Sequence, residues 1–391
     1  MILFEEALKL VLHNANIIDI ESVKLIDSLN RVLAHDIISD IDMPPFNKSA
    51  VDGYACKISD IHNNLEVLET IAAGALPKYN ISHSQCSKIM TGAMLPVGAD
   101  CVIMVEHVEK INEKHIRFTK EKTGVNIAYK AEDIKKGSIV INKGTLIKPQ
   151  HIALIASVGY PELKVYKQPK VAVLTTGSEL VEPNVIPSLG QIRNSNAWQI
   201  YSQIQRVNAI PVYFGIIEDT EEKIDFAIKK AIAENDIVIL TGGVSMGDFD
   251  FVPKILKQNN VNLLFEKIKI QPGKPTVFGI HNKSYIFGLP GNPVSSFVVF
   301  EVLVKPFLQK LMGSIELQNN LLLPIGVDFK RSKADRLHWV PSKINQKGEV
   351  IPIEYHGSAH VSSICDADVI FPVNIDVFEI KKGDIVNVRQ I

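Results

Sequence analysis

Residues 237–251 read IVILTGGVSMGDFDF, and an apolar run rich in β-branched residues stops there at two glycines. A strand buried on both faces of a parallel sheet has this composition. In an open α/β sheet, ligands bind beyond the carboxyl ends of the strands, where glycines let backbone N–H groups approach an anion closely. Asp248 and Asp250 follow, and carboxylates suit a hard cation. The stretch therefore predicts a parallel α/β sheet with a site for a phosphorylated ligand and a metal nearby.

The same sequence of an apolar strand followed by a polar loop occurs at three other places. KVAVLTTGSEL covers residues 170–180, VNAIPVYFGIIEDTEEKI covers 207–224, and YIFGLPGNPVSS covers 285–296. Each segment alone is also typical of an ordinary turn, because glycine often does no more than end a strand. Taken together, the four segments predict that polar loops gather at one edge of the sheet.

Composition excludes several classes of protein. The chain has 391 residues, enough for two to four domains, and its net charge of −1 argues against a nucleic-acid binder with a broad basic surface. The four cysteines form no close pair in sequence, so we expect them to pack as small apolar residues. The N-terminus lacks the basic start of a signal peptide, and no uninterrupted apolar stretch reaches about 18 residues. We therefore expect a cytoplasmic protein without a membrane span.

The pattern along the chain predicts a multidomain α/β plus β protein. Helical periodicity at Phe4–Leu12, Ser22–His35 and Lys148–Gly159 flanks a run of short strand-like pieces that begins after Met43-Pro44-Pro45. Strands, loops and helices then alternate, which predicts a central parallel α/β domain, and short strands return near the end. The four expected domains are helical (1–42 plus 144–168), inserted β (43–143), α/β (169–312) and a C-terminal β barrel (313–391).

Three further segments carry polar side chains in stiff surroundings. MPPFNKSAVDGYA (43–55) contains Asp52, and KIMTGAMLPVGAD (88–100) contains Thr91. From local sequence, both residues are also typical of solvated turns. KIKIQPGKP (267–275) places Lys274 between Pro-Gly and a proline that fixes the backbone, which favours a held ammonium group for phosphate or another oxyanion.

Acidic residues in the strand-end loops predict a divalent cation. Glu179, Asp219 and Asp250 would lie at the same sheet edge and would repel one another unless a cation offset them. Mg²⁺ prefers oxygen ligands and binds phosphate, and no cysteine–histidine set indicates a softer metal. Each acid alone is equally typical of a solvated loop.

The segments quoted above, together with GQIRNSNA (190–197), occur in an order that closely resembles the molybdopterin molybdenumtransferases. These enzymes insert molybdenum into the dithiolene of the molybdenum cofactor, and the C-terminal domain of gephyrin belongs to the same family. The resemblance runs from about residue 2 to the C-terminus and is weakest after residue 312.

The resemblance implies both an assembly and a reaction. It implies an α/β domain of molybdopterin-binding type and a homodimer whose site forms between that domain and the partner's inserted domain. Adenylylated molybdopterin and molybdate would react to give molybdenum-bound molybdopterin and AMP, with Mg²⁺ assisting. Transient contact with other proteins of molybdenum cofactor biosynthesis is also expected.

The resemblance also implies roles for particular residues. Asp52, Thr91, Asp250 and Lys274 would be catalytic, and Glu179, Asp219 and Asp250 would bind the metal. The expected substrate-binding residues are Thr176, Gly177, Ser195, Asn196, Thr241, Gly242, Gly243, Ser245, Pro290, Gly291 and Asn292.

The chain departs from the family pattern at a few positions. Asn47-Lys48 stands where an aspartate and asparagine are common, Gln271 where lysine is common, and Ala128 where arginine is expected. Two alternative functions stay open. An adenylyltransferase that makes the adenylylated pterin has a similar α/β domain but typically that domain alone, and a gephyrin-like scaffold would not need the acidic residues.

Overall fold

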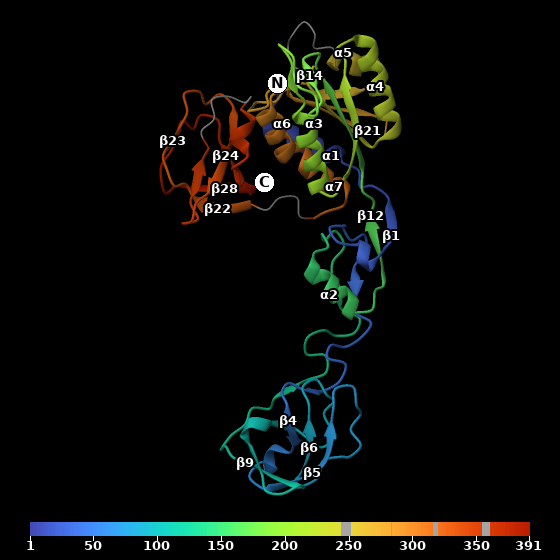
Figure 1. The fold of residues 1–391 in the computed structure, drawn as a ribbon, viewed down its shortest axis with the longest axis vertical. Coiled ribbons are helices and arrows are strands. Elements are labelled where there is room, and N and C mark those ends of the chain that lie inside the picture. The colour runs from blue at the N-terminus through green and yellow to red at the C-terminus, as the bar shows by residue number, and fades with distance from the viewer. Residues whose placement is uncertain (244–251, 283, 316–319, 354–359) are drawn as a thin grey trace. The chain divides into compact units, whose positions relative to one another are not determined.

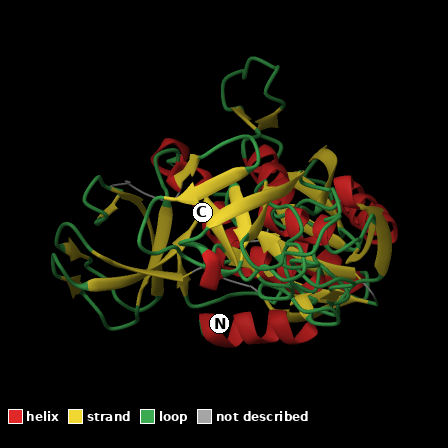
Figure 2. Cartoon of the chain, turned by 90° about the horizontal axis from the view of Figure 1, so that it is seen from below, coloured by secondary structure: helices red, strands yellow, loops and turns green. Residues whose placement is uncertain are grey.

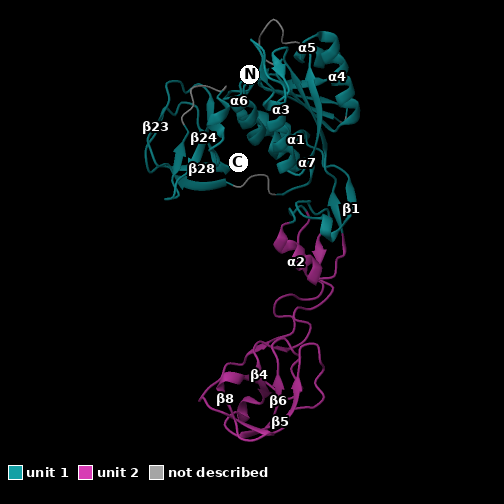
Figure 3. Ribbon diagram, viewed as in Figure 1, with its two compact units in different colours: residues 1–34, 144–147, 163–391 teal, residues 35–143, 148–162 magenta. Residues whose placement is uncertain are grey.

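A computed structural model describes residues 1–243, 252–282, 284–315, 320–353 and 360–391. The described chain combines helices, strands and long connecting loops, as Figure 2 shows. It divides into two compact units, coloured separately in Figure 3. Unit 1 comprises residues 1–34, 144–147 and 163–391, and unit 2 comprises residues 35–143 and 148–162. Asp250 and Ser245, both expected in the site, lie outside the described residues.

A six-stranded sheet forms the centre of unit 1 (Figure 1). Its strands, in spatial order, are β16 (Ile210–Ile217), β13 (Lys170–Thr176), β17 (Ile237–Thr241), β21 (Ser284–Leu289), β20 (Val277–His281) and β18 (Asn262–Phe265). The first four are parallel, as the sequence predicts. β20 pairs antiparallel with β21, and β18 pairs antiparallel with β20, so two strands at one side of the sheet depart from the predicted parallel arrangement. The connection between β20 and β21 is too short for the crossover that parallel strands need.

Helices cover both faces of this sheet because its strands are apolar on both sides. Val171 and Val173 of β13 share a core with α3 (Asn196–Arg206) and α6 (Pro293–Val299). The alternate residues of β13 face a second core that contains α4 (Glu221–Glu234) and α5 (Val252–Gln258). Successive strand residues point to opposite faces, so one apolar strand serves both cores. α6 continues through a π-helical segment (Phe300–Val304) into α7 (Lys305–Leu311).

The predicted helix over Ser22–His35 is wrong. The chain there forms β1 (Ile20–Lys24), a short 3₁₀ helix (Leu25–Asp27), a turn, and isolated bridges at Val32 and Leu33. β1 pairs with β12 (Glu162–Tyr166), and tertiary pairing of this kind overrides local helical periodicity. The first predicted helix is present as α1 (Phe4–Asn14), whose Phe4 ring packs against Trp339 at a centroid distance of 5.7 Å.

Three chain segments of unit 1 are joined where the chain leaves for unit 2 and returns. The Leu33 N–H donates to Thr145 O (3.0 Å), and the Gly144 N–H donates back to Leu33 O (2.7 Å). The Ala34 N–H donates to Lys164 O (3.0 Å). We call residues 31–34, 144–147 and 163–166 the junction.

The C-terminal part of unit 1 is a sheet whose pairings form a ring. β24 (Leu337–Ile344), β26 (Val369–Val373), β28 (Ile385–Gln390) and β22 (Asn320–Pro324) pair in that order. Ile325, directly after β22, bridges to Val350 of β25 (Val350–Pro352), which pairs with β24. Shorter strands are β19 (Ile270–Gln271), which pairs with β24, and the pair β23 (Phe329–Lys330) and β27 (Glu379–Ile380). A loop strand pair, β14 (Leu180–Val181) and β15 (Ile192–Arg193), precedes α3.

Unit 2 contains a second six-stranded sheet. Its order is β7 (Cys101–Met104), β4 (Gly53–Cys56), β6 (Gln85–Ile89), β5 (Asn64–Ile71), β9 (His115–Phe118) and β8 (Val108–Lys110). All of β4 is buried, because Tyr54 and Cys56 enter one core and Ala55 enters the other. The pairs β2 (Ile37–Ile38) with β11 (Ile139–Ile141) and β3 (Lys48–Ser49) with β10 (Ile127–Ala128), and helix α2 (Pro149–Ser157), complete the unit.

Within the described ranges, no helix combines the length and the apolar character needed to cross a lipid bilayer.

Candidate functional site

The carboxyl ends of four parallel strands meet at one edge of the central sheet. β13, β16, β17 and β21 are parallel neighbours, so the loops after Thr176, Ile217, Thr241 and Leu289 leave the same edge. The prediction that polar loops gather there is confirmed. The antiparallel β20 adds a segment that the sequence did not place. Its first residue, Val277, pairs with Gly288, so the chain enters β20 from this edge and Lys274 lies close before it.

Glycines let these loops approach one another closely. Gly242 has φ +90°, and a Cβ atom there would lie 2.4 Å from the Thr176 carbonyl oxygen. A Cβ on Gly243 would lie 2.9 Å from Thr176 Oγ1, and one on Gly291 would lie 3.8 Å from the Gly242 Cα. The loops after β13, β17 and β21 therefore touch through backbone atoms. Such a surface presents N–H groups without side chains in the way.

Asn196 joins the first turn of α3 to two of these loops. Its Nδ2 donates to Thr241 Oγ1 (3.2 Å) and to the Gly291 carbonyl oxygen (2.6 Å). Thr241 Oγ1 in turn donates to the Pro290 carbonyl oxygen (3.4 Å). Ser195, which precedes the helix, is exposed. The structure thus brings Asn196, Thr241 and the loop at Pro290 together.

Some buried polar atoms beside this network have no hydrogen-bond partner among the residues that the structure describes. They are Thr175 Oγ1, Thr176 Oγ1 and Asn196 Oδ1. An unpaired buried polar group costs about 1–3 kcal/mol, so such groups are uncommon except where function requires them. Sequence reasoning missed Thr175. The available signal was a hydroxyl residue in an otherwise apolar strand, at the position that pairs with Thr241.

Two of the predicted metal ligands lie at the loop after β13. The Ser178 N–H donates to Asp219 Oδ2 (3.1 Å), which fixes the Asp219 carboxylate against this loop. A Cβ atom on Gly177 would lie 2.8 Å from a carboxylate oxygen of Glu179, so that side chain turns back over the same loop. In the part of the chain that the structure describes, no three histidine, cysteine or acidic side chains gather closely enough to hold a metal.

Lys274 is held by its backbone while its side chain is exposed. The Ile268 N–H and the Thr276 N–H both donate to the Lys274 carbonyl oxygen at 3.1 Å. A Cβ on Gly273 would lie 2.4 Å from Val299 Cγ2, so the turn before Lys274 packs tightly against α6. The backbone of Lys274 is therefore fixed, and the prediction that its ammonium group is held stays a prediction.

Asp52 and Thr91 form a hydrogen-bonded pair in unit 2. The Thr91 N–H and the Thr91 hydroxyl both donate to Asp52 Oδ1, at 2.7 and 2.9 Å. These bonds hold the pKa of the exposed Asp52 carboxyl below its usual value, and the bond from the Thr91 backbone N–H has the larger effect. The Val105 N–H donates to the Asp52 carbonyl oxygen (3.1 Å) and fixes the backbone. Two residues far apart in the sequence thus form one ionised, oriented carboxylate.

Known proteins resemble this chain over nearly its whole length. Residues 2–159 match the family described as MoeA N-terminal region (domain I and II), 172–310 match the probable molybdopterin binding domain, and 325–391 match the MoeA C-terminal region (domain IV). A molybdopterin molybdenumtransferase of Bacillus subtilis is 39% identical over 78% of this chain and 74% of its own length. One from Staphylococcus epidermidis is 35% identical over 98% of this chain and 94% of its own.

This chain belongs to the molybdopterin molybdenumtransferase family. A solved structure agrees with this assignment: the molybdopterin biosynthesis MoeA protein from Pyrococcus horikoshii OT3 superimposes with a TM-score of 0.86 and 31% identity, covering all of both chains.

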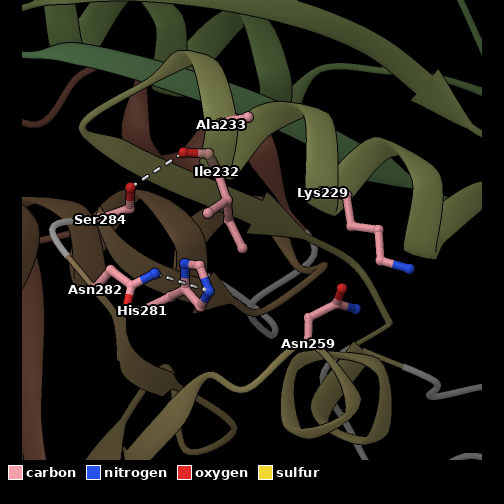
Figure 4. A pocket seen from close by; sticks show the side chains of 7 residues that line it. All are labelled: Lys229, Ile232, Ala233, Asn259, His281, Asn282 and Ser284. Carbon is pink, nitrogen blue, oxygen red and sulfur yellow. Dashed lines mark hydrogen bonds between the residues drawn. The ribbon is translucent and has the colours of Figure 1, made fainter.

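A cavity of about 480 Å³ lies at the opposite edge of the sheet from the joined loops (Figure 4). His281 ends β20 and Ser284 begins β21, so both residues mark that opposite edge. Ser284 Oγ lies 3.2 Å from the Ile232 carbonyl oxygen, to which it donates. The lining residues are Lys229, Ile232, Ala233, Asn259, His281, Asn282 and Ser284. None of them belongs to the residues that the resemblance to molybdopterin molybdenumtransferases implied.

Proposed function

We propose that this chain is a molybdopterin molybdenumtransferase, an enzyme of molybdenum cofactor biosynthesis. It would take adenylylated molybdopterin and molybdate and yield molybdenum-bound molybdopterin and AMP. The observation that carries the proposal is the set of touching glycine loops at the carboxyl edge of a sheet, in a chain of this family. Such an edge suits a phosphorylated ligand, because backbone N–H groups can approach its oxygens.

Each part of the edge has a chemical task in this proposal. The loops at Gly242-Gly243 and Gly291 contact the phosphate and the pterin, and Asn196 keeps those loops together. Asn292 follows Gly291 directly, and Ser245, outside the described residues, is expected to bind the same ligand. The exposed ammonium of Lys274 offsets negative charge on phosphate or molybdate. Transition-state stabilisation of this electrostatic kind commonly contributes about 10²–10³ in rate for each group.

The acidic residues at this edge suit a magnesium ion. Glu179 and Asp219 supply carboxylate oxygens beside the loop after β13, and Asp250 completes the proposed set from outside the described residues. Oxygen donors of this kind fit Mg²⁺. When bound, the ion would neutralise charge on the departing AMP phosphate.

A homodimer would complete the site. In this proposal, the Asp52–Thr91 pair of one subunit faces the α/β domain of the other. Support comes from the chemistry of the pair, since an ionised and oriented carboxylate is suited to the entering metal centre. Proteins that supply the substrate or receive the product would contact the dimer only transiently.

An insertion assay tests the reaction. Purified protein is incubated with adenylylated molybdopterin and molybdate, with and without Mg²⁺, and AMP release and pterin-bound molybdenum are measured. We expect both products, with a strong dependence on Mg²⁺. If the protein instead formed adenylylated pterin from molybdopterin and ATP, it would be an adenylyltransferase and the proposal would be wrong.

Substitution of the two catalytic aspartates tests the site. Asp52→Ala and Asp250→Ala should each abolish insertion, because each removes a carboxylate from the reacting centre. Both variants should remain dimeric by light scattering. Insertion at the parent rate by either variant would remove that residue from the mechanism.

A further inference from the structure

Three buried cysteines lie side by side in the sheet of unit 2. Cys56 on β4 pairs with Cys86 on β6 and with Cys101 on β7, directly across the strands on both sides. All three are 0% exposed and belong to one core cluster. The sequence predicts buried cysteines but gives no sign that they are adjacent. Cys86 lies 30 positions after Cys56 in the chain, and Cys101 lies 45 positions after Cys56.

The geometry distinguishes one pair from the other. The Cys56 and Cys101 sulfur atoms are 3.6 Å apart and in hydrogen-bond contact. Residues directly opposite in antiparallel strands have Cα atoms about 4.5–5.5 Å apart, and a disulfide spans Cα separations of about 4.4–6.8 Å. Bond formation therefore needs only a local movement of the two sulfur atoms. Cys86 has no comparable sulfur contact among the described residues.

The thiols also differ in acidity. The hydrogen bond between the two thiols, in which either sulfur can be the donor, lowers the pKa of Cys101, and the same contact, with burial, raises the pKa of Cys56. Burial, with a smaller effect of Glu66, raises the pKa of Cys86 to about 12. Because the thiolate is the reactive form of cysteine, the directions of these pKa shifts favour Cys101 as the first thiol to react, and Cys86 stays protonated.

We propose that Cys56 and Cys101 are an oxidation site at which hydrogen peroxide converts two thiols into a reversible disulfide. The Cys101 thiolate attacks one peroxide oxygen, the O–O bond breaks, and hydroxide leaves, giving a sulfenic acid. The Cys56 sulfur then attacks the Cys101 sulfur, the S–O bond breaks, and water leaves. In total, two thiols and one peroxide give one disulfide and two waters.

The site lies in the strands that carry Asp52. β4 begins directly after Asp52, and Val105, directly after β7, donates to the Asp52 carbonyl oxygen. A bond between β4 and β7 would therefore join the two strands that fix this backbone. Because both sulfur atoms are buried, only an oxidant as small as peroxide reaches them, at a rate set by local opening of these strands. The inference does not depend on the proposed function.

Peptide mapping of the full-length protein tests the site. The protein is treated with hydrogen peroxide, free thiols are alkylated under denaturing conditions, and non-reduced peptides are identified by mass spectrometry. We expect a crosslinked pair of peptides containing Cys56 and Cys101, lighter by two hydrogens, which dithiothreitol separates. A link between Cys56 and Cys86 would overturn the proposal. So would complete alkylation of Cys56 and Cys101 under peroxide that fully oxidises the exposed Cys365.

Variants separate the roles of the two cysteines. Cys86→Ser should still form the crosslink, since Cys86 takes no part. Cys56→Ala should leave Cys101 as a sulfenic acid that dimedone traps when the treated protein is denatured in its presence, because no second thiol is in reach. Thermal melting checks that each variant is folded. If a variant is unfolded, the peptide map of the unsubstituted protein tests the proposed disulfide. Trapping on Cys86 in place of Cys101 would contradict the assigned nucleophile.

Discussion

At the scale of single residues, the Asp52–Thr91 pair shows how two ordinary side chains make one specialised group. Two bonds from Thr91 converge on Oδ1, so the carboxylate is both ionised and oriented. The pKa of Asp52 lies below its unfolded value. The resulting contribution to stability is present above the unfolded pKa and is lost as the pH falls through the folded pKa.

Replacement of the Thr91 hydroxyl tests this pair. Thr91→Val keeps the backbone N–H bond but removes the hydroxyl donor, so the pKa of Asp52 should rise toward its ordinary value. With one donor instead of two orienting the carboxylate, AMP release should slow by up to about 10²-fold. Thr91→Ser is the matched control and should retain most activity. An unchanged rate in Thr91→Val would show that the backbone bond alone orients Asp52.

Sequence reasoning reached some residues of the site and missed others for physical reasons. Asp52, Thr91 and Asn196 stand in segments with strong local constraints, and the structure connects each of them to a partner. Thr175 was missed because its meaning depends on pairing with Thr241, and a single strand carries no information about its neighbour. The row of three cysteines was invisible for the same reason.

At the scale of elements, the closeness of three loops depends on glycines without room for a side chain. Gly242→Ala would place a Cβ atom 2.4 Å from the Thr176 carbonyl oxygen, so β13 and β17 must separate at their carboxyl ends. Gly190→Ala is the matched control, because Gly190 has a similar φ of +87° with no atom within 4 Å of the added Cβ.

The two alanine variants should therefore differ in stability. The control carries only the cost of a left-handed backbone, about 1–2 kcal/mol. Gly242→Ala adds overpacking, typically about 1–3 kcal/mol more. Urea unfolding measures the difference, and the insertion assay should show loss of activity in Gly242→Ala alone. Equal stability of the two variants would mean that the loops are not closely joined.

Helices and strands were predicted best where the pattern of apolar residues in the sequence matches their burial in the structure. The four parallel strands are apolar because helices cover both faces, so their sequence signal is strong. Residues 22–35 have a helical pattern of apolar residues, but residues 22–24 pair with β12 and Val32 and Leu33 bridge to other segments, so non-local pairing decides their structure. The direction of β20 was also beyond the sequence signal, because the length of its connection to β21 became clear only once the strand bounds were known.

At the scale of the whole molecule, a buried histidine connects stability to pH. Burial first, and then the nearby Arg331 and Arg336, lower the pKa of His338 to about 4. An unfolded histidine titrates near 6.5, so the neutral folded form is fully favoured above that pH. The free energy of unfolding therefore falls progressively as the pH is lowered from about 6.5 to 4, by about 2–3 kcal/mol.

Denaturation at two pH values checks this dependence. Unit 1 should be markedly less stable at pH 4.5 than at pH 7.5, with Trp339 fluorescence reporting on the same strand. His338→Gln removes the titrating group, so its stability should change less between the two pH values. An equal loss in both proteins would assign the pH dependence to other residues.

The junction has a consequence for how such a protein can arise. Residue 33 is hydrogen-bonded to residues 144 and 145, and residue 34 is hydrogen-bonded to residue 164. The chain thus leaves and re-enters unit 1 at nearly the same point on both excursions. During evolution, a gene for a smaller ancestor could acquire a coding segment at this point, or lose one, while the surrounding backbone kept its path.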